Sequence, residues 1–354
     1  MFVQGVGLAH PAQRYTKADC WASFRRSAWF ERLDRRSRWI AEKVLTRDNG
    51  IESRWLAVDS LDDAFVITPD ILLARFTQHA PNLASTAGRR ALDTAHVAAA
   101  EIDAVVVSTC TGYLCPALSG YLIERLGLRP DVQAYDLVGQ GCAAAIPNWR
   151  IAETLVAAGR ARHVLSVCVE VSSAAMYLDD DPGVLISACL FGDGAGAAVL
   201  SAQPGAAGRR IEWHDAASLI EPAQRKALMF EQKDGMLRNI LTREVPALAA
   251  ERAREVLETV LERAGLHGDD IAAWIVHAGG RDVLLALERR FEVDGDAFRY
   301  SAAMLREYGN LSSAFVYFVL EAALADGAPG GWWWLSAFGA GFACHGALLA
   351  VGPA

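Results

Sequence analysis

The chain has 354 residues, 53% of them hydrophobic and 21% charged, a composition typical of a globular protein with a large core. Its formal net charge of −8 argues against a general nucleic-acid-binding surface. The seven cysteines form no CxxC pair and no regular His/Cys spacing, which argues against a disulfide framework or a metal site and favours a reducing cytoplasm. The opening MFVQGVGLAHPAQRYT lacks the basic and long apolar regions of a secretory signal, so none is expected.

The first half of the chain predicts helices alternating with buried strands. Residues 15–48 are rich in Arg and Trp at helical spacing, typical of a solvated amphipathic face, and residues 70–100 predict a long amphipathic helix. Buried strands are expected at IDAVVVSTC, VQAYDLVG and HVLSVCVEV, because β-branched residues run there without polar alternation. CLFGDGAGAAVLS predicts a glycine-rich turn that leads into a further strand.

After about residue 204 the pattern restarts. RRIEWHDAAS predicts a strand, VPALAAERAREVLETVLERAG an amphipathic helix and DIAAWIVHA a buried strand. VVVSTC and WIVHAGG occupy matching places in the two halves, which indicates an internal duplication. We therefore predict one α/β unit built from an N-terminal half (1–204) and a C-terminal half (205–354), with the functional site between them.

The end of the chain carries no Asp, Glu, Lys or Arg from Gly327 onward. Its length alone would fit a transmembrane helix, but glycines, a proline and His345 interrupt the apolar run. We expect a hairpin of two buried strands and no integral membrane segment.

Three strand–turn–helix junctions present a cysteine, a histidine and an asparagine. Cys142 follows two glycines and precedes a helical pattern, where the helix dipole favours a thiolate. His277 ends the strand AAWIVHA, and Asn310 follows Gly309 before another helix. Alone, each could be structural: a buried cysteine, a core histidine, a turn asparagine. Together, at the loop ends of an α/β fold, they predict a nucleophile and its partners.

Six segments in order resemble one known family: QGCAAAIPNWRIA, VCVEVSSAAM, CLFGDGAGAAVL, VHAGG, YGNLSSAFVYFVLE and FGAGF. Over essentially its whole length, the chain resembles the type III polyketide synthases, the family of chalcone and stilbene synthases, among the thiolase-fold condensing enzymes. The resemblance implies a five-layered αβαβα sandwich of two similar halves.

The resemblance also implies the chemistry. Cys142 would accept the starter acyl group from its CoA thioester, and His277 would hold the thiolate ionised. His277 and Asn310 would donate hydrogen bonds to the thioester carbonyl of malonyl-CoA as CO2 leaves. Acyl-CoA and malonyl-CoA are thus the expected substrates, and no cofactor or metal is implied.

Two pocket positions bear on the choice of starter. Phe191 matches a gatekeeper phenylalanine of the family, although a buried aromatic side chain also serves ordinary packing. The second gatekeeper position, counted back from Val245-Pro246, carries Asn239 in place of phenylalanine, which would open or repolarise the pocket. The surrounding DGMLRNILTREVP resembles bacterial alkylresorcinol and alkylpyrone synthases, which use fatty acyl starters.

The resemblance places further residues around the substrate. Glu170, Ser312 and Cys110 match a hydrogen-bond network of ring closure, in which Cys110 replaces a threonine and is a weaker donor. Cys115 matches a residue that crosses the dimer interface, so a homodimer is expected. The expected pocket comprises Phe191, Asn239, Cys110, Thr111, Cys115, Glu170, Ser172, Met176, Ser312 and Gly339, and the expected CoA-binding cations are Lys43 and Arg47. A cation on an exposed helix is, however, more often merely solvated.

Three other functions remain open on the sequence. An initiating ketoacyl synthase of fatty acid synthesis would share the Cys–His–Asn set but would act once, on an acyl carrier protein. A thiolase would need a second active cysteine, for which Cys344 is the candidate, although such a cysteine is usually just buried. A scaffold could keep the fold without the chemistry, but it would not need the three side chains together.

Overall fold

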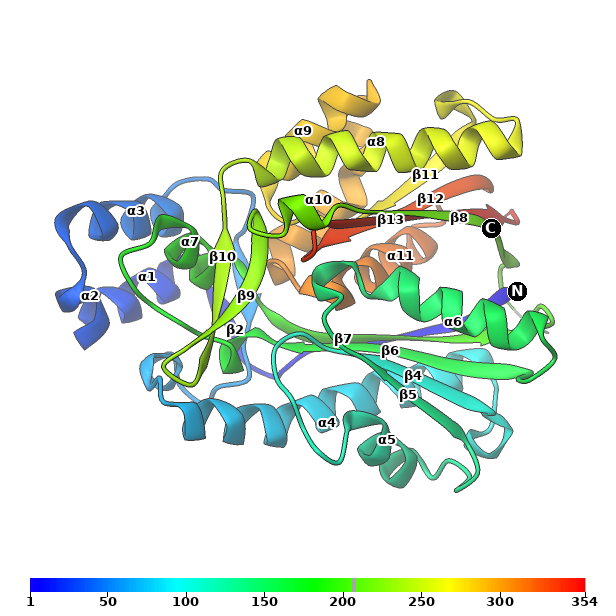
Figure 1. The fold of residues 1–354 in the computed structure, drawn as a ribbon, viewed down its shortest axis with the longest axis horizontal. Coiled ribbons are helices and arrows are strands. Elements are labelled where there is room, and N and C mark those ends of the chain that lie inside the picture. The colour runs from blue at the N-terminus through cyan, green and yellow to red at the C-terminus, as the bar shows by residue number, and fades with distance from the viewer. Residues whose placement is uncertain (206–207, 354) are drawn as a thin grey trace.

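Nine strands form a continuous sheet in the computed structural model, which describes residues 1–205 and 208–353 (Figure 1). From one edge to the other the strands are β11 (Ile271–Val276), β12 (Gly331–Gly339), β13 (Ala343–Val351), β8 (Ile211–Ile220), β1 (Phe2–Ala9), β7 (Asp193–Ser201), β6 (His163–Val171), β4 (Ala104–Ser108) and β5 (Gln133–Leu137). Only two residue pairs join β1 to β8, at Phe2–Glu212 and Val3–Ile211. This short seam divides the sheet into two parts.

The two parts repeat one strand order. Counted from the seam, β1-β7-β6-β4 in the first half corresponds to β8-β13-β12-β11 in the second. β4 and β11, which contain VVVS and WIV, therefore occupy equivalent places, and the predicted similarity of the two halves is confirmed. In the described residues β5 has no counterpart beyond β11. The division at residue 204, between β7 and β8, stays a prediction.

Helices complete a five-layered arrangement, which Figure 1 shows from top to bottom. The outer layers are formed by α4 (Pro69–Ala95) with α5 (Leu118–Leu126), and by α8 (Val245–Ala264) with α9 (Arg281–Phe291). The central layer contains α6 (Ala145–Ala157) and α11 (Phe315–Ala325), each of which contacts strands of both halves. The predicted αβαβα thiolase-like fold is thus confirmed.

Local chemistry explains where α4 begins and ends. Thr68 caps its first turn by accepting the backbone N–H of Ile71, and Pro69 supplies a pre-set φ at the first helical position. His96 adopts the left-handed conformation that ends the helix at Ala95, five residues earlier than the sequence pattern predicts.

The remaining elements surround this sandwich. They are α1 (Lys17–Arg26), α2 (Ala28–Arg32), α3 (Arg35–Thr46), α7 (Pro182–Leu190), α10 (Arg299–Tyr308), β2 (Arg14–Thr16), β3 (Ser53–Trp55), β9 (Leu228–Lys233) and β10 (Met236–Leu241). Helices α1, α2 and α3 form a helical lobe at one end of the molecule, packed against α7 (Figure 1). The sequence analysis missed β1, β2, β3, α7, α10 and the β9–β10 hairpin.

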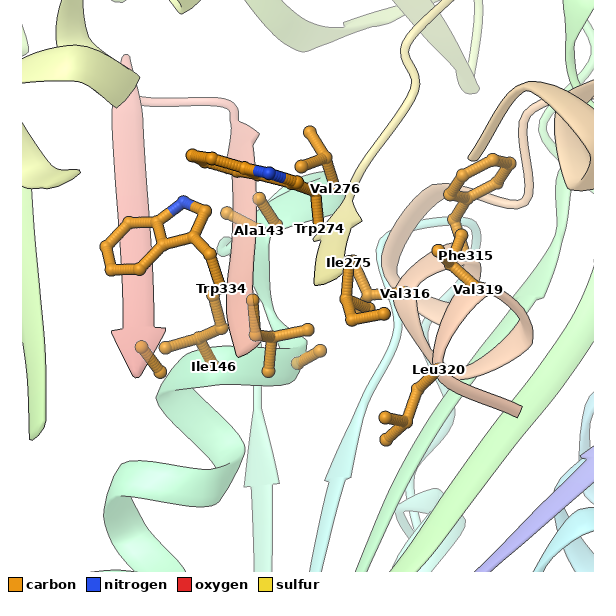
Figure 2. Close-up of a cluster of buried hydrophobic side chains, with 14 of the residues drawn as sticks. Ala143, Ile146, Trp274, Ile275, Val276, Phe315, Val316, Val319, Leu320 and Trp334 are labelled. Carbon is orange, nitrogen blue, oxygen red and sulfur yellow. The ribbon is translucent and has the colours of Figure 1, made fainter. Parts of the chain in front are cut away.

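A buried apolar cluster packs against the three strand–turn–helix junctions that present Cys142, His277 and Asn310. Figure 2 shows side chains of β11, β12, α6 and α11 gathered there, with Ile275 beside Val316. The cluster includes Val276, which directly precedes His277, Ala143, which directly follows Cys142, and Leu311, which directly follows Asn310. Burial of each large apolar side chain stabilises the fold by about 1.5–3 kcal/mol, so the packing of this cluster holds the junctions in place.

The charge-free end of the chain forms the expected hairpin. β12 and β13 pair antiparallel, with Trp334 opposite Leu348 and Gly339 opposite Ala343. Cys344 lies fully buried in β13, as expected of a packing residue. Across residues 1–205 and 208–353, no helix is both long and apolar enough to cross a membrane.

Candidate active site

Cys142 lies in a single helical turn, Gly141–Ala143, that leads into α6. Gly141 has φ +55°, and a Cβ there would lie 3.0 Å from the backbone N of Ala340. A Cβ on Gly339 would lie 2.8 Å from the backbone N of Ala143. Glycine at both positions therefore lets the Cys142 turn pack directly against the end of β12. Gly339 was expected in the substrate pocket, but it supports this turn and lines none of the cavities described below.

One cavity of about 630 Å³, here called the catalytic cavity, brings the three predicted residues together. Cys142, His277 and Asn310 all line it, although they come from three distant segments of the chain. They converge because β11 and the turns before α6 and α11 end on the same side of the central layer.

His277 is held by its surroundings but makes no side-chain hydrogen bond. Its backbone N–H donates to Ser336 of β12 at 2.9 Å, and its ring lies between Phe315 and Phe338 at centroid distances of 5.4 and 5.1 Å. The residue is only 1% exposed, and neither ring nitrogen has a partner among the described residues. Because buried polar atoms are normally satisfied, these nitrogens are free for a ligand in the catalytic cavity.

The Asn310 side chain is oriented by two hydrogen bonds. Its Nδ2 donates to the carbonyl of Gly279 at 3.1 Å, and its Oδ1 accepts the backbone N–H of Ser312 at 2.8 Å. One of the two amide N–H groups thus remains available beside His277.

Ser312 and Glu170 form a polar network behind Cys142. Ser312 has φ +52°, a left-handed conformation that is costly for a residue other than glycine. Its hydroxyl lies 3.2 Å from both Cys142 Sγ and Glu170 Oε1, and its single proton can serve one of them at a time. Cys110 Sγ lies 3.4 Å from Ser312 Oγ and from both oxygens of Glu170, and Thr111 donates to Glu170 at 2.9 Å. The residues of the expected network are therefore in contact.

Glu170 was expected in the substrate pocket, but it lines neither the catalytic cavity nor the two cavities described below. Its side chain is fully buried, and its carboxylate also accepts the backbone N–H of Cys110 at 3.1 Å and the hydroxyl of Ser313. Burial raises the pKa of Glu170 above its usual value, while the hydroxyl and N–H donors oppose that shift.

A smaller apolar cavity of about 50 Å³, here called the inner cavity, adjoins the catalytic cavity at Cys142, Phe191, Leu228 and Asn239. It contains most of the pocket residues expected from the sequence: Cys110, Thr111, Ser172, Met176, Phe191, Asn239 and Ser312. An outer cavity of about 680 Å³ shares Cys110, Thr111 and Phe230 with the inner cavity and continues past Tyr113 and Val138. The inner cavity thus lies between the catalytic cavity, with which it shares Cys142, and the outer cavity.

The β9–β10 hairpin supplies a wall that sequence reasoning missed. Leu228, Met229 and Phe230 line the inner cavity together with Asn239 of the paired strand, whose partner in the hairpin is Phe230. The Asp234-Gly235 pair, a typical two-residue hairpin turn between the short segments LMFEQK and MLRNIL, was the available signal for this hairpin.

Besides Gly339 and Glu170, three further expected residues lie outside the cavity walls. Cys115 is exposed on its loop and lines none of the three cavities. Lys43 places its ammonium 3.4 Å from the ring centroid of Trp39, and Arg47 is exposed. Their helix α3 nevertheless reaches the catalytic cavity through Ile40 and Val44.

The ionisation of Cys142 differs from the sequence-based prediction. Burial raises the pKa of its thiol to about 12, opposed by the Ser312 hydroxyl and reinforced by Glu170. Burial likewise lowers the pKa of His277 to about 3. No hydrogen bond joins the two side chains in the described part of the chain, so the resting site contains a thiol and a neutral imidazole.

Alkylation of Cys142 by iodoacetamide is therefore expected to accelerate steadily as the pH rises from 7 to 9. A thiol whose pKa lies above 9 gains thiolate about tenfold per pH unit in this range. Peptide mass spectrometry would follow the Cys142 peptide separately from the other cysteines. A rate that levels off below pH 8 would contradict the neutral pair and restore the thiolate–imidazolium prediction.

The chain is similar to proteins of one enzyme family along most of its length. Residues 59–213 match the family described as "FAE1/Type III polyketide synthase-like protein", and residues 212–353 match "Chalcone and stilbene synthases, C-terminal domain". The 1,3,6,8-tetrahydroxynaphthalene synthase of Streptomyces coelicolor is 35% identical over 264 residues, which cover 72% of this chain and 67% of that protein.

Two further relatives agree with this assignment. The "Alpha-pyrone synthesis polyketide synthase-like Pks18" of Mycobacterium tuberculosis is 29% identical over 77% of this chain and 71% of its own length. The crystal structure of PKS-I from the brown alga Ectocarpus siliculosus superposes with a TM-score of 0.88 at 27% identity, over 98% of this chain and 97% of that one. The chain therefore belongs to the type III polyketide synthase family of condensing acyltransferases.

Proposed function

We propose that this polyketide synthase loads a long-chain acyl group from CoA onto Cys142, extends it with malonyl-CoA and cyclises the product to an alkylresorcinol or alkylpyrone. The observation that carries the catalytic part is the pair of unpartnered His277 nitrogens in the same cavity wall as Cys142 and Asn310. A buried imidazole with two free nitrogens, beside a thiol and a free amide N–H, matches the needs of a decarboxylative condensation.

Acyl transfer begins from the neutral thiol. As Cys142 Sγ attacks the thioester carbonyl of the starter, its proton passes to His277, which acts as a general base. The new C–S bond forms, the bond to the CoA sulfur breaks, and the proton returns to the departing CoA thiolate. The acyl chain is left on Cys142.

Chain extension uses the same imidazole as a donor. Because burial keeps His277 neutral, its ring carries a single N–H, and this group and the free N–H of Asn310 can donate to the thioester oxygen of malonyl-CoA. The bond to the carboxylate breaks, CO2 leaves and an enolate forms. Its carbon attacks the Cys142 thioester, a C–C bond forms and the bond to Cys142 Sγ breaks, which leaves the extended chain on CoA and a Cys142 thiolate that takes up a proton. Transfer of this chain from CoA back to Cys142 starts the next round.

The series of cavities supports a long acyl starter. From Cys142 the inner cavity is lined mainly by apolar side chains, among them Leu56, Met176, Val184 and Met229, and it leads to the larger outer cavity. Each buried methylene contributes about 0.8 kcal/mol, so an apolar path favours longer chains. Asn239 Oδ1 is buried there without a partner, which costs about 1–3 kcal/mol unless an enol hydroxyl of the growing polyketide donates to it.

Asn239→Phe is expected to shift the preferred starter toward shorter chains, because a phenyl ring would fill the wall shared by the catalytic and inner cavities. The measurement is kcat/KM for a series of acyl-CoA starters. Asn239→Leu is the matched control, since it removes the amide at similar volume. If both variants keep the preference of the wild type, Asn239 does not limit the space for the starter.

The proposed function is tested by mass spectrometry of products formed from malonyl-CoA with starters from acetyl- to stearoyl-CoA, one aromatic starter, and no starter. Resorcinols or pyrones from the long-chain starters are expected. Products from malonyl-CoA alone would contradict the long-chain starter. A single ketoacyl product that requires an acyl carrier protein would instead indicate the initiating ketoacyl synthase.

The proposed binding partners follow from the same proposed function. Lys43 and Arg47 would bind the phosphates of CoA near the cavity mouth, where α3 lies, and no further cofactor is needed. We also propose a cytoplasmic homodimer, because Tyr113 and Val138 beside the outer cavity are 72% and 67% exposed, and large exposed apolar side chains favour a partner. A sedimentation mass equal to one chain would contradict the dimer.

A further inference from the structure

The helical lobe has a charge opposite to that of the whole protein. Residues 25–47 carry eight cationic and three acidic side chains, a net charge of +5, in a chain whose net charge is −8. The lobe projects from one end of the molecule (Figure 1). We call the exposed cations between residues 25 and 38 the basic face: Arg25, Arg26, Arg32, Arg35, Arg36 and Arg38.

The fold does not account for several of these cations. Among the described residues, the side chains of Arg25, Arg35 and Arg36 have neither a hydrogen bond nor an ion pair, whereas Arg26 reaches Asp62 at 3.8 Å. Arg35 and Arg36 also occupy the first turn of α3, where the helix dipole disfavours positive charge. A sequence selected only for the stability of α3 would place acidic residues there.

An exposed tryptophan lies next to these cations. Trp39 is 53% exposed and follows Arg35 and Arg36 at helical spacings of four and three residues, which puts the three side chains on neighbouring positions of α3. Lys43, one turn further, places its ammonium over the Trp39 ring. An indole ring flanked by Arg and Lys is typical of surfaces that meet the headgroup region of a bilayer, where the ring enters and the cations contact phosphates.

We propose that the basic face and Trp39 bind the surface of an anionic lipid bilayer. Clustered cations gain from the negative surface potential of such a bilayer, and Trp39 adds an amphipathic anchor. The same helix α3 lines the catalytic cavity through Ile40 and Val44, so binding would bring the cavity mouth close to the lipid. That a lipid-soluble product leaves there rests on the proposed function, whereas the binding itself does not.

Co-sedimentation of the full chain with vesicles, without substrate, tests the proposal independently of catalysis. The wild type is expected to bind phosphatidylcholine vesicles that contain phosphatidylglycerol, to bind less as salt rises, and to leave pure phosphatidylcholine vesicles unbound. The triple variant R25E/R35E/R36E is expected to lose at least about tenfold in affinity. Its first-turn acids suit the dipole of α3, so it should stay folded.

Two further variants decide what kind of surface is recognised. R160E/R162E/R289E removes three exposed arginines outside the lobe and is expected to bind vesicles like the wild type. Trp39→Ala keeps every charge and is expected to weaken binding. The proposal is overturned if the wild type does not bind, or if the control variant loses as much affinity as R25E/R35E/R36E. It is also overturned if Trp39→Ala binds as tightly as the wild type, because that result would indicate a general affinity for polyanions such as acidic proteins.

Discussion

Cys142→Ala is expected to abolish chain extension, because no other thiol of the described residues lines the catalytic cavity. Without Cys142 Sγ the starter has no covalent attachment, and the enolate has no acyl group to attack. The measurement is polyketide formation from acyl-CoA and malonyl-CoA, followed by mass spectrometry. The neighbouring Cys110 cannot take over, because it lines the inner and outer cavities but not the catalytic cavity that contains His277 and Asn310.

The same variant contains its own control. His277 and Asn310 are untouched in Cys142→Ala, so slow release of CO2 from malonyl-CoA should persist and would show that the site is still assembled. Formation of extended polyketides by Cys142→Ala would refute the covalent mechanism. Loss of both activities together with a lowered melting temperature would instead point to a folding defect, which circular dichroism would detect.

His277→Ala is expected to lower the decarboxylation of malonyl-CoA by roughly 10²–10³, the usual effect of removing one donor to a developing oxyanion. Decarboxylation is measured as CO2 released in the Cys142→Ala background, which separates this step from acyl transfer. A neutral ring donates through its one N–H, and burial keeps the His277 ring neutral across the working pH range because its pKa is lowered to about 3. The rate should therefore show no loss between pH 6 and pH 8 that traces to protonation of His277.

His345→Ala provides a matched control for this substitution. His345 is also buried, with burial lowering its pKa to about 4, but it lies in β13 and its Nδ1 contacts Ser218 at 2.7 Å, away from the three cavities. This variant should lose stability but keep decarboxylation per folded molecule. Equal loss of decarboxylation in His345→Ala and His277→Ala would mean that His277 acts through packing rather than as a donor.

The sequence by itself determined the fold and the three central residues. The runs VVVS and WIV predicted equivalent buried strands, and β4 and β11 occupy equivalent places in the two halves. The glycines before Cys142 and Asn310 marked the turns that precede α6 and α11. These features depend on neighbouring residues, whose periodicity, turn chemistry and capping are local properties.

Only the tertiary structure decided which distant residues share hydrogen bonds in the site and which segments form the walls of its cavities. Ser312 reaches Cys142 across 170 positions of sequence, and Thr111 reaches Glu170 across 59. The β9–β10 hairpin became a wall of the inner cavity, and Gly339 proved to support the Cys142 turn rather than the substrate.

The pKa values of Cys142 and His277 show most clearly the difference between what the local sequence determines and what the packing of distant segments decides. The position of Cys142 before a helix predicted a lowered thiol pKa, because the dipole is a local feature. Burial raised the pKa of Cys142 and lowered that of His277, since desolvation depends on every segment packed around them. The sequence thus determined which groups meet, and the packing of distant segments decided their charge and the space left beside them.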